Sequence, residues 1–235
     1  MADFTFDLPF YLSTLAPESE ILELGCGSGR LTRALATRGH RITGIDNSAE
    51  MLDRAASQDT RNISYICMDM NEILLPGRFN AVIVPYNTFT LLESPATVAR
   101  CLKRIRGHLK EGGRLLLQIF TANPASFPST GARTFQFQIF TTADGGKIIK
   151  ETLKHYREEE QVIMLNERYR VRPAGSLRKN EDLAHSMRLL ALPYSQWAEL
   201  LIEAGFTIVS EYGDYDLSSF VQSRDSRLLL AARTA

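Results

Sequence analysis

The sequence has few cysteines, no excess charge of either sign and no long apolar run. Its 235 residues include three cysteines, Cys26, Cys67 and Cys101, which are far apart and lack the spacing of metal ligands. We therefore expect reduced thiols in a cytoplasmic protein, and neither a disulfide framework nor a metal site. Lysine and arginine together number 27, as do aspartate and glutamate, so no overall charge attracts nucleic acid or an anionic membrane. No stretch approaches the roughly 20 apolar residues of a membrane helix, so no membrane partner is expected.

Apolar runs typical of buried strands recur through the first half of the chain. Segments with the helical spacing of hydrophobic residues separate them. Strands are predicted at Ile21–Leu24, Arg41–Ile45, Ile63–Met68, Phe79–Val84 and Arg114–Phe120. Because the strands alternate with helices, they require a parallel sheet that is covered by those helices.

Two of the intervening helices have recognisable ends. Ser48 is placed to cap a helix that runs through Ser57. Ser94 and Pro95 open a second helix, and the pair Gly112–Gly113 is predicted to end it.

A different pattern follows in the second half. The runs TFQFQIFTT, KIIKETLKHY and QVIMLNERYRV are rich in β-branched and aromatic residues, and turn signals separate them. With a further strand at Asp182–Leu190, they predict an antiparallel insert over residues 132–192, which a linker at Asn123–Gly131 joins to the first half. A helix and two strands are predicted to close the chain at Tyr194–Ala204, Phe206–Tyr212 and Arg227–Ala232. The predicted fold class is therefore α/β, with a doubly wound, mostly parallel, seven-stranded sheet and an antiparallel β insert after the fifth strand.

The glycines of Gly25–Gly29 lie where doubly wound sheets bind ligands, directly after the first strand. The fingerprint of nicotinamide dinucleotide sites would require glycine or alanine at position 30, where this chain has Arg30. The spacing here is G-x-G-x-G, with Glu23 before it and Asp46 at the end of the second strand. This pattern resembles motif I of the class I methyltransferases that use S-adenosylmethionine.

The resemblance runs from Ile21 to about Phe120 and continues more weakly into the two C-terminal strands. It rests on the segments ILELGCGSGR, GIDNSAEML, CMDM and VPYNTF. It implies a Rossmann-like enzyme that takes a methyl group from S-adenosylmethionine and releases S-adenosylhomocysteine. Residues 1–235 would then form one methyltransferase domain. Residues 1–122 would be the cofactor-binding half and residues 132–192 the β insert. Residues 193–235 would supply a helix and the strands that complete the sheet.

The family's cofactor contacts can be carried over to matching positions around the glycine loop. Gly25, Cys26 and Gly27 would lie against the methionine portion of the cofactor. Asp46 would hydrogen-bond both ribose hydroxyls, since a diol suits a bidentate carboxylate. Glu23 would position the loop or the ammonium group of the cofactor.

The adenosine end has its own expected contacts. Asn47 and Met51 would flank the ribose and the adenine. Asp69 would accept a hydrogen bond from the adenine amino group, and Met70 would offer backbone contacts to the ring. The N-terminal DLPFYL resembles a segment that precedes motif I in small-molecule members of the family, where Tyr11 would cover the cofactor.

The segment after the fourth strand, Val84 to Asn87, occupies the place where the family holds groups beside the transferable methyl. Pro85 would contact the cofactor there. The order does not match the Asn-Pro-Pro-Tyr motif of methylases that modify nucleobase amines or glutamine amides, so nucleic acid is not the expected partner. Methyl transfer mainly requires alignment in a dry site, so no general base is assigned. Tyr86, Asn87 and His185 are the candidates.

The insert resembles the acceptor-side sheet of small-molecule methyltransferases, which caps the pocket or pairs two subunits. It therefore predicts a small-molecule methyl acceptor, and it allows a homodimer through the β insert. On the insert, Tyr156, Arg168, Tyr169, Arg170 and His185 could face an acceptor. Substrate contacts are expected from Asn87, Tyr156, Arg168 and Tyr215, the last of these on the loop Gly213–Phe220.

We predict methyl transfer to a nitrogen or oxygen of a small molecule. One alternative is a tRNA or protein methyltransferase, which a basic, aromatic patch around Arg168, Tyr169, Arg170, Arg172 and Arg178 would support. Another is a non-catalytic S-adenosylmethionine-binding or partner protein, because the roles that the resemblance implies for Asp46 and Asp69 are in binding the cofactor and not in reacting with it.

Overall fold

The chain forms two β-sheets in a computed structural model that describes residues 5–58, 61–122, 133–174 and 180–234. The predicted linker Asn123–Gly131 and Arg178 lie outside these residues. No helix in the described part of the chain has the length and apolar character needed to cross a membrane. The elements of the first half are α1 (Leu8–Thr14), β1 (Glu20–Leu24), α2 (Arg30–Ala36), β2 (Arg41–Asp46), α3 (Ala49–Ala56), β3 (Ile63–Cys67), η1 (Met70–Glu72), β4 (Phe79–Val84), η2 (Thr88–Leu91), α4 (Pro95–Gly107) and β5 (Leu109–Phe120). Those of the second half are β6 (Arg133–Thr141), β7 (Lys147–Arg157), β8 (Val162–Arg172), β9 (Glu181–Leu190), α5 (Tyr194–Glu203), β10 (Phe206–Tyr212) and β11 (Arg227–Thr234).

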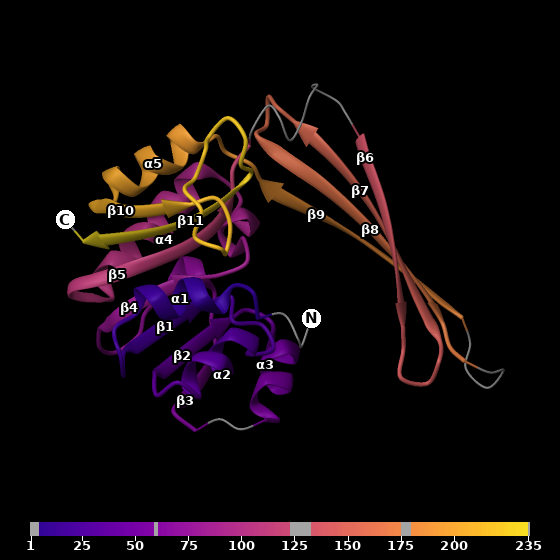
Figure 1. The fold of residues 1–235 in the computed structure, drawn as a ribbon, viewed down its shortest axis with the longest axis horizontal. Helices are drawn as coiled ribbons and strands as arrows, with labels where there is room; N and C mark the ends of the chain where they lie inside the picture. The colour runs from indigo at the N-terminus through magenta and orange to yellow at the C-terminus, as the bar shows by residue number, and fades with distance from the viewer. Residues whose placement is uncertain (1–4, 59–60, 123–132, 175–179, 235) are drawn as a thin grey trace.

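The larger sheet has seven strands in the order β10-β11-β5-β4-β1-β2-β3 (Figure 1). Strands β1 to β5 pair in parallel, and β11 and β10 join the β5 edge antiparallel to their neighbours. The prediction of a mostly parallel, doubly wound sheet is therefore confirmed. Because parallel strands share a direction, the loops after β1, β2, β3 and β4 all open at one edge of the sheet.

Helices cover both faces of this sheet, and alternate strand residues supply the two cores. Leu22 and Leu24 pack on one face with the core residues of α4 and α5, including the fully buried Trp197. Ile21 packs on the other face with α1 and α2, where Tyr11 is buried. The strands are therefore buried on both sides, as their continuous apolar runs predict.

The end of α4 differs from the prediction. Ser94 caps this helix as expected, since its side chain accepts a hydrogen bond from the Thr97 amide. The helix ends at Gly107, however, and Gly112 and Gly113 lie inside β5. Gly112 has φ +68° at the point where the pairing of β5 with β4 shifts register, so the glycines form an irregularity within a strand and do not end a helix.

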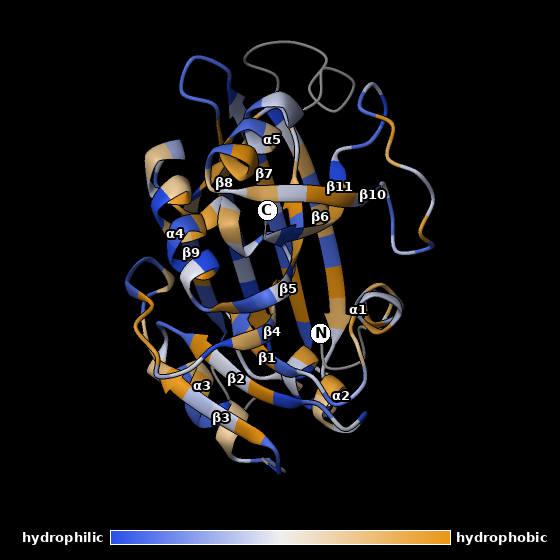
Figure 2. Cartoon of the chain, turned by 90° about the vertical axis from the view of Figure 1, so that its left-hand side faces the viewer, coloured by the Kyte–Doolittle hydropathy of each residue, from blue (hydrophilic) through white to orange (hydrophobic). Residues whose placement is uncertain are grey.

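The insert is a separate four-stranded antiparallel sheet in the order β6-β7-β8-β9, as predicted. It projects away from the larger sheet (Figure 1), and hydrophobic and hydrophilic residues alternate along its strands (Figure 2). Its base is anchored, because Leu190 at the end of β9 and Leu192 after it belong to the main core.

Candidate functional site

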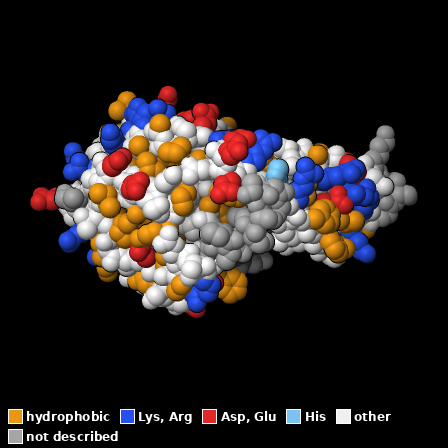
Figure 3. All heavy atoms as spheres, turned by 90° about the horizontal axis from the view of Figure 1, so that it is seen from above, with side chains coloured by type: hydrophobic (Ala, Val, Ile, Leu, Met, Phe, Trp, Pro, Cys, Tyr) orange, Lys and Arg blue, Asp and Glu red, His pale blue; other side chains and the backbone are white. Residues whose placement is uncertain are grey.

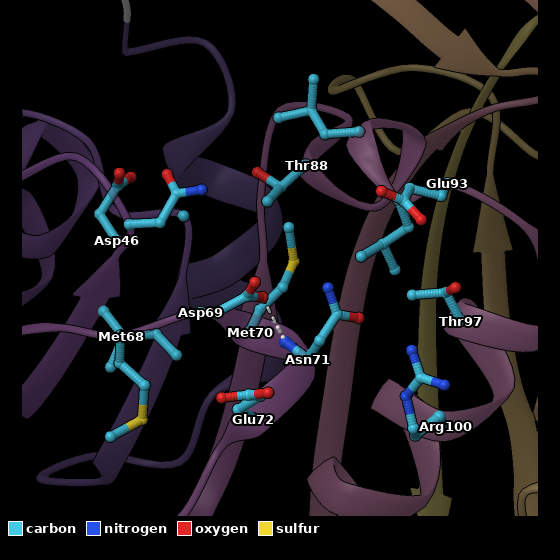
Figure 4. A pocket seen from close by; sticks show the side chains of 15 residues that line it. Asp46, Met68, Asp69, Met70, Asn71, Glu72, Thr88, Glu93, Thr97 and Arg100 are labelled. Carbon is cyan, nitrogen blue, oxygen red and sulfur yellow. Dashed lines mark hydrogen bonds between the residues drawn. The ribbon is translucent and has the colours of Figure 1, made fainter.

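A cavity of about 510 Å³ opens at the edge where β1, β2, β3 and β4 end, which is large enough for a nucleoside-sized ligand. In Figure 4, Asp46 and Asp69 approach it from one side, and Thr88, Glu93, Thr97 and Arg100 approach it from the other. Its lining residues are Gly25, Ile45, Asp46, Asn47, Met68, Asp69, Met70, Asn71, Glu72, Thr88, Leu91, Leu92, Glu93, Thr97 and Arg100.

The glycine loop between β1 and α2 brings main chain to the cavity. Gly25, Gly27 and Gly29 have φ values of +68°, +54° and +75°, which L side chains rarely adopt. A Cβ atom on Gly25 would lie only 2.5 Å from Cγ2 of Thr88, so this glycine and the residue after the β4 turn are in direct contact. The loop therefore has no room for a side chain at its first glycine.

Asp46 holds this loop from the end of β2. Its Oδ2 accepts a hydrogen bond from the Gly27 amide at 2.8 Å, and its Oδ1 accepts one from the Ser48 amide at 2.9 Å. These two bonds fix the plane of the carboxylate at the cavity wall. Each oxygen keeps a further lone pair, so the group can accept hydrogen bonds from a vicinal diol.

Asp69 supplies a second carboxylate after the neighbouring strand β3. Its Oδ1 accepts a hydrogen bond from the Asn71 amide at 2.7 Å, and within the described residues its Oδ2 accepts none. Met68 and Met70 add apolar wall beside it. An acceptor oxygen next to an apolar wall suits a flat heterocycle with an exocyclic amino group.

The turn after β4 is strained. Tyr86 and Asn87 both have left-handed backbone, with φ values of +53° and +64°. Such conformations cost about 1–3 kcal/mol each in non-glycine residues and occur mainly at functional sites. The Oδ1 atom of Asn87 is buried without a hydrogen-bond partner among the described residues.

A second group of buried polar residues lies where α1, β1 and α2 meet. Asp7 is fully buried and forms a bidentate ion pair with Arg30, in which Nη1 lies 2.9 Å from Oδ1. Tyr11 is also fully buried, its hydroxyl has no partner among the described residues, and burial raises its pKa well above the usual value. Glu23 accepts a hydrogen bond from Thr32 Oγ1 at 2.7 Å, and burial raises its pKa to about 7.

These features together fit S-adenosylmethionine. Asp46 suits the ribose diol, and Asp69 with its apolar wall suits adenine. The unpaired hydroxyl of Tyr11 suits a ligand end that carries both hydrogen-bond donors and acceptors, as an amino acid does, because buried polar atoms without partners are rare in native proteins.

Other residues proposed from the sequence take different places. Gly25, Asp46, Asn47, Asp69 and Met70 line the cavity. The buried thiol Cys26 and the exposed Met51, whose methyl would lie 3.4 Å from a Cβ on Gly27, are near it without lining it. The lining also does not include Tyr11, Glu23, Gly27, Pro85, Tyr86 or Asn87.

The candidates on the insert and on the C-terminal loop do not line this cavity. Arg168 is paired with Asp182, and His185 stacks on the ring of Tyr169 with centroids 6.5 Å apart. Tyr156 is half-buried on β7. The Tyr215 hydroxyl donates a hydrogen bond to Gln118 on β5 at 2.7 Å.

The sequence reading missed the wall formed by η2 and the start of α4. Thr88, Glu93, Thr97 and Arg100 line the cavity from that side. Their position after the fourth strand and around the Ser94 cap could have indicated that they line the cavity, since every loop at this edge of the sheet faces the same site. Their residue types gave none.

A family model described as a methyltransferase domain matches residues 21–113. This span contains the glycine loop and both strand-end carboxylates. Residues 21–113 thus form a methyltransferase domain.

Curated relatives agree with this assignment. A putative methyltransferase, YqeM, of Bacillus subtilis is 25% identical over 208 residues, which cover 86% of this chain and 79% of the relative. The ubiquinone biosynthesis O-methyltransferase of Coxiella burnetii is 31% identical over 163 residues, which cover 67% of this chain and 63% of the relative. This methyltransferase is thus similar to the second relative over less than two thirds of that protein's length.

Solved structures share the fold. An S-adenosylmethionine-bound amino pentose methyltransferase, CalS10, of Micromonospora echinaspora superposes with a TM-score of 0.73 at 19% identity, over 97% of this chain and 89% of the other. The similarity extends over nearly the whole of this methyltransferase, insert included, and it concerns the fold alone.

Proposed function

We propose that this methyltransferase transfers the methyl group of S-adenosylmethionine to a nitrogen or oxygen of a small molecule. The observation that carries the proposal is the position of the insert beside the cavity. Arg188 on β9 donates from its Nη1 to the carbonyl oxygen of Glu93 at 2.7 Å, and Glu93 lines the cavity wall. The base of the insert therefore contacts the cavity wall on the side away from Asp46, and we propose that an acceptor enters there.

The chain's own groups would bind, orient and exclude water. The cofactor, when bound, supplies an electrophilic methyl group on a sulfonium that leaves as a neutral thioether. We propose that Asp46 and Asp69 hold the adenosine, flanked by Asn47, Met51 and Met70. For the amino-acid end we propose Tyr11, Glu23, Gly25, Cys26, Gly27 and Pro85.

The strained turn after β4 is the proposed place of the acceptor. The unpaired Oδ1 of Asn87 can accept a hydrogen bond from an N–H or O–H group and so orient the acceptor atom. Orientation of the two reacting groups is the main contribution that such a reaction needs from the protein. Tyr86 and Tyr215 are proposed to border the acceptor on the same side.

The rival reading as a tRNA methyltransferase depends on free cations on the insert. In the described residues, Arg168 and Arg172 both pair with Asp182, and Arg170 pairs with Glu151. These three arginines pair with two carboxylates, which compensate most of their charge, so little net positive charge remains to attract phosphates. This favours a small molecule as the acceptor.

We also propose that two copies of the chain pair through the insert. Phe135, Phe137 and Ile139 alternate along the outer strand β6, so they share one face, and they are 60%, 66% and 56% exposed. Figure 3 shows hydrophobic side chains gathered beside lysines and arginines on the narrower lobe. Exposed apolar surface of this kind marks a protein interface.

Sedimentation velocity tests the pairing. The wild-type chain is expected to sediment as a dimer and Phe137→Lys as a monomer, because a charge would have to be buried in the interface. Val209→Lys on β10, where the native side chain is 62% exposed, is the matched control and should stay dimeric. A wild-type monomer at tens of micromolar would rule out this interface.

The function itself is tested by calorimetric titration with S-adenosylhomocysteine, with NADH as control. We expect selective binding with a Kd in the micromolar range, or about −8 kcal/mol. A screen of amine and alcohol acceptors should then give S-adenosylhomocysteine formation that depends on the acceptor. Binding without turnover on any acceptor would support a non-catalytic partner protein, and binding of neither ligand would remove the proposal.

A further inference from the structure

Gln118 connects three segments that meet at the edge of the candidate site. It lies near the end of β5 and is only 2% exposed. Its side-chain Oε1 accepts hydrogen bonds from the Tyr86 amide at 3.3 Å and from the Tyr215 hydroxyl at 2.7 Å. Its main-chain oxygen accepts a third, from the Asn87 amide at 3.2 Å. One buried residue thus links the turn after β4 to the loop Gly213–Phe220.

The turn that Gln118 holds needs external support. Tyr86 and Asn87 are consecutive left-handed residues, a conformation that persists only where surrounding contacts enforce it. Both of their amides donate to Gln118. Thr88, the next residue, is the one that closes on Gly25. A change in the turn would therefore move the groups that face the glycine loop.

Tyr215 is held firmly as the donor in this arrangement. Its pKa is raised to about 12, mainly by burial, so the phenol keeps its proton. The Arg227 guanidinium lies over its ring, 4.5 Å from the centroid. Because Oε1 already receives two donors, the amide orientation of Gln118 follows from the network.

We propose that Gln118 is a positioning residue whose amide oxygen, shared by the Tyr86 amide and the Tyr215 hydroxyl, clamps the strained turn after β4 to the loop Gly213–Phe220. The clamp sets where Asn87 and Thr88 stand against the glycine loop. It couples the order of that C-terminal loop to the shape of the cofactor site. Its effect on ligand affinity rests on the proposed function, whereas the link between the two segments does not.

Four variants isolate the shared oxygen. Gln118→Met keeps the length of the side chain and removes the acceptor, and Gln118→Glu keeps an acceptor oxygen. Tyr215→Phe removes one donor, and the fourth variant combines Gln118→Met with Tyr215→Phe. Amide hydrogen exchange of the free protein reports on segments 85–91 and 213–220, calorimetry with S-adenosylhomocysteine reports on the site, and thermal unfolding shows that each variant is folded.

We expect Gln118→Met to speed exchange in both segments and to weaken S-adenosylhomocysteine binding, each by roughly tenfold, the scale of one lost buried hydrogen bond. Gln118→Glu should stay within about threefold of wild type. Tyr215→Phe should speed amide exchange at 213–220. In the double variant, exchange in that segment should be only slightly faster than in Gln118→Met, because both changes remove the same bond.

The proposal would be overturned if Gln118→Met and Gln118→Glu had the same exchange rates and the same affinity for S-adenosylhomocysteine. It would also be overturned if the two changes in the double variant sped exchange at 213–220 by the product of their separate factors. If Gln118→Met does not fold, unchanged exchange at 213–220 in Tyr215→Phe would still overturn it. If the wild-type protein binds no S-adenosylhomocysteine, the proposed function fails. The exchange measurements still test whether Gln118 links segments 85–91 and 213–220.

Discussion

Replacement of Gly25 by alanine should weaken S-adenosylhomocysteine binding by about a hundredfold or more. The new Cβ would lie 2.5 Å from Thr88 Cγ2 and 2.9 Å from its Oγ1. Thr88 cannot easily turn away, because its Oγ1 donates to the Pro85 carbonyl at 2.7 Å. The loop must therefore move out of the position that faces the cavity.

Gly39→Ala is the matched control. Gly39 also has a left-handed backbone, with φ +90°, but a Cβ there meets nothing within 4 Å. Gly39→Ala therefore measures the backbone strain of an alanine in the left-handed conformation, without a collision like that between Gly25→Ala and Thr88. In calorimetric titrations with S-adenosylhomocysteine, Gly39→Ala should bind with nearly the affinity of the wild type, and Gly25→Ala should not. Equal affinities would mean that contact between Gly25 and Thr88 does not shape the site.

The local pattern of the sequence was enough to predict the sheet and the glycine loop. Strands such as Phe79–Val84 are continuous apolar runs, and the Ser48 and Ser94 caps mark helix starts with a side chain that accepts a main-chain hydrogen bond. Both signals act over a few residues, so no tertiary contact had to be known.

Features that depend on tertiary contact were not predictable in this way. Gly112 and Gly113 look like a helix end, but β4 is available to pair with this segment, and the glycines became part of β5. The 38% exposure of the Met51 side chain beside Gly27 likewise has no local signal in the sequence. The contact between Gly25 and Thr88 joins residues far apart in the chain, so no local pattern shows it.

The cavity wall shows the same limit. The carboxylates Asp46 and Asp69 could be placed because each follows a strand directly. Glu93 and Arg100, by contrast, lie after η2 and inside α4, and only the packing of these elements brings both side chains to the cavity. The clamp at Gln118 was equally hidden, because a glutamine within an apolar strand gives no sign of the loop that its side chain will meet.

Asp46→Asn should weaken S-adenosylhomocysteine binding by roughly thirtyfold, because both carboxylate oxygens have two roles. Each accepts a main-chain amide, from Gly27 at 2.8 Å and from Ser48 at 2.9 Å, and each is also proposed to accept a ribose hydroxyl. An asparagine presents one oxygen and one NH₂ group, so one of these amides would face a donor. The glycine loop would lose an anchor as well as a ligand contact.

Asp53→Asn is the control for charge alone. Asp53 is an exposed residue on α3, outside the cavity lining, and its neutralisation removes the same charge without touching the loop. The 2′-deoxy analogue of S-adenosylhomocysteine separates the two roles of Asp46. If the carboxylate binds the ribose, the wild type should lose affinity for the analogue, whereas Asp46→Asn should bind both ligands about equally. An equal loss in both proteins would mean that Asp46 acts only by holding Gly27 and Ser48 in place.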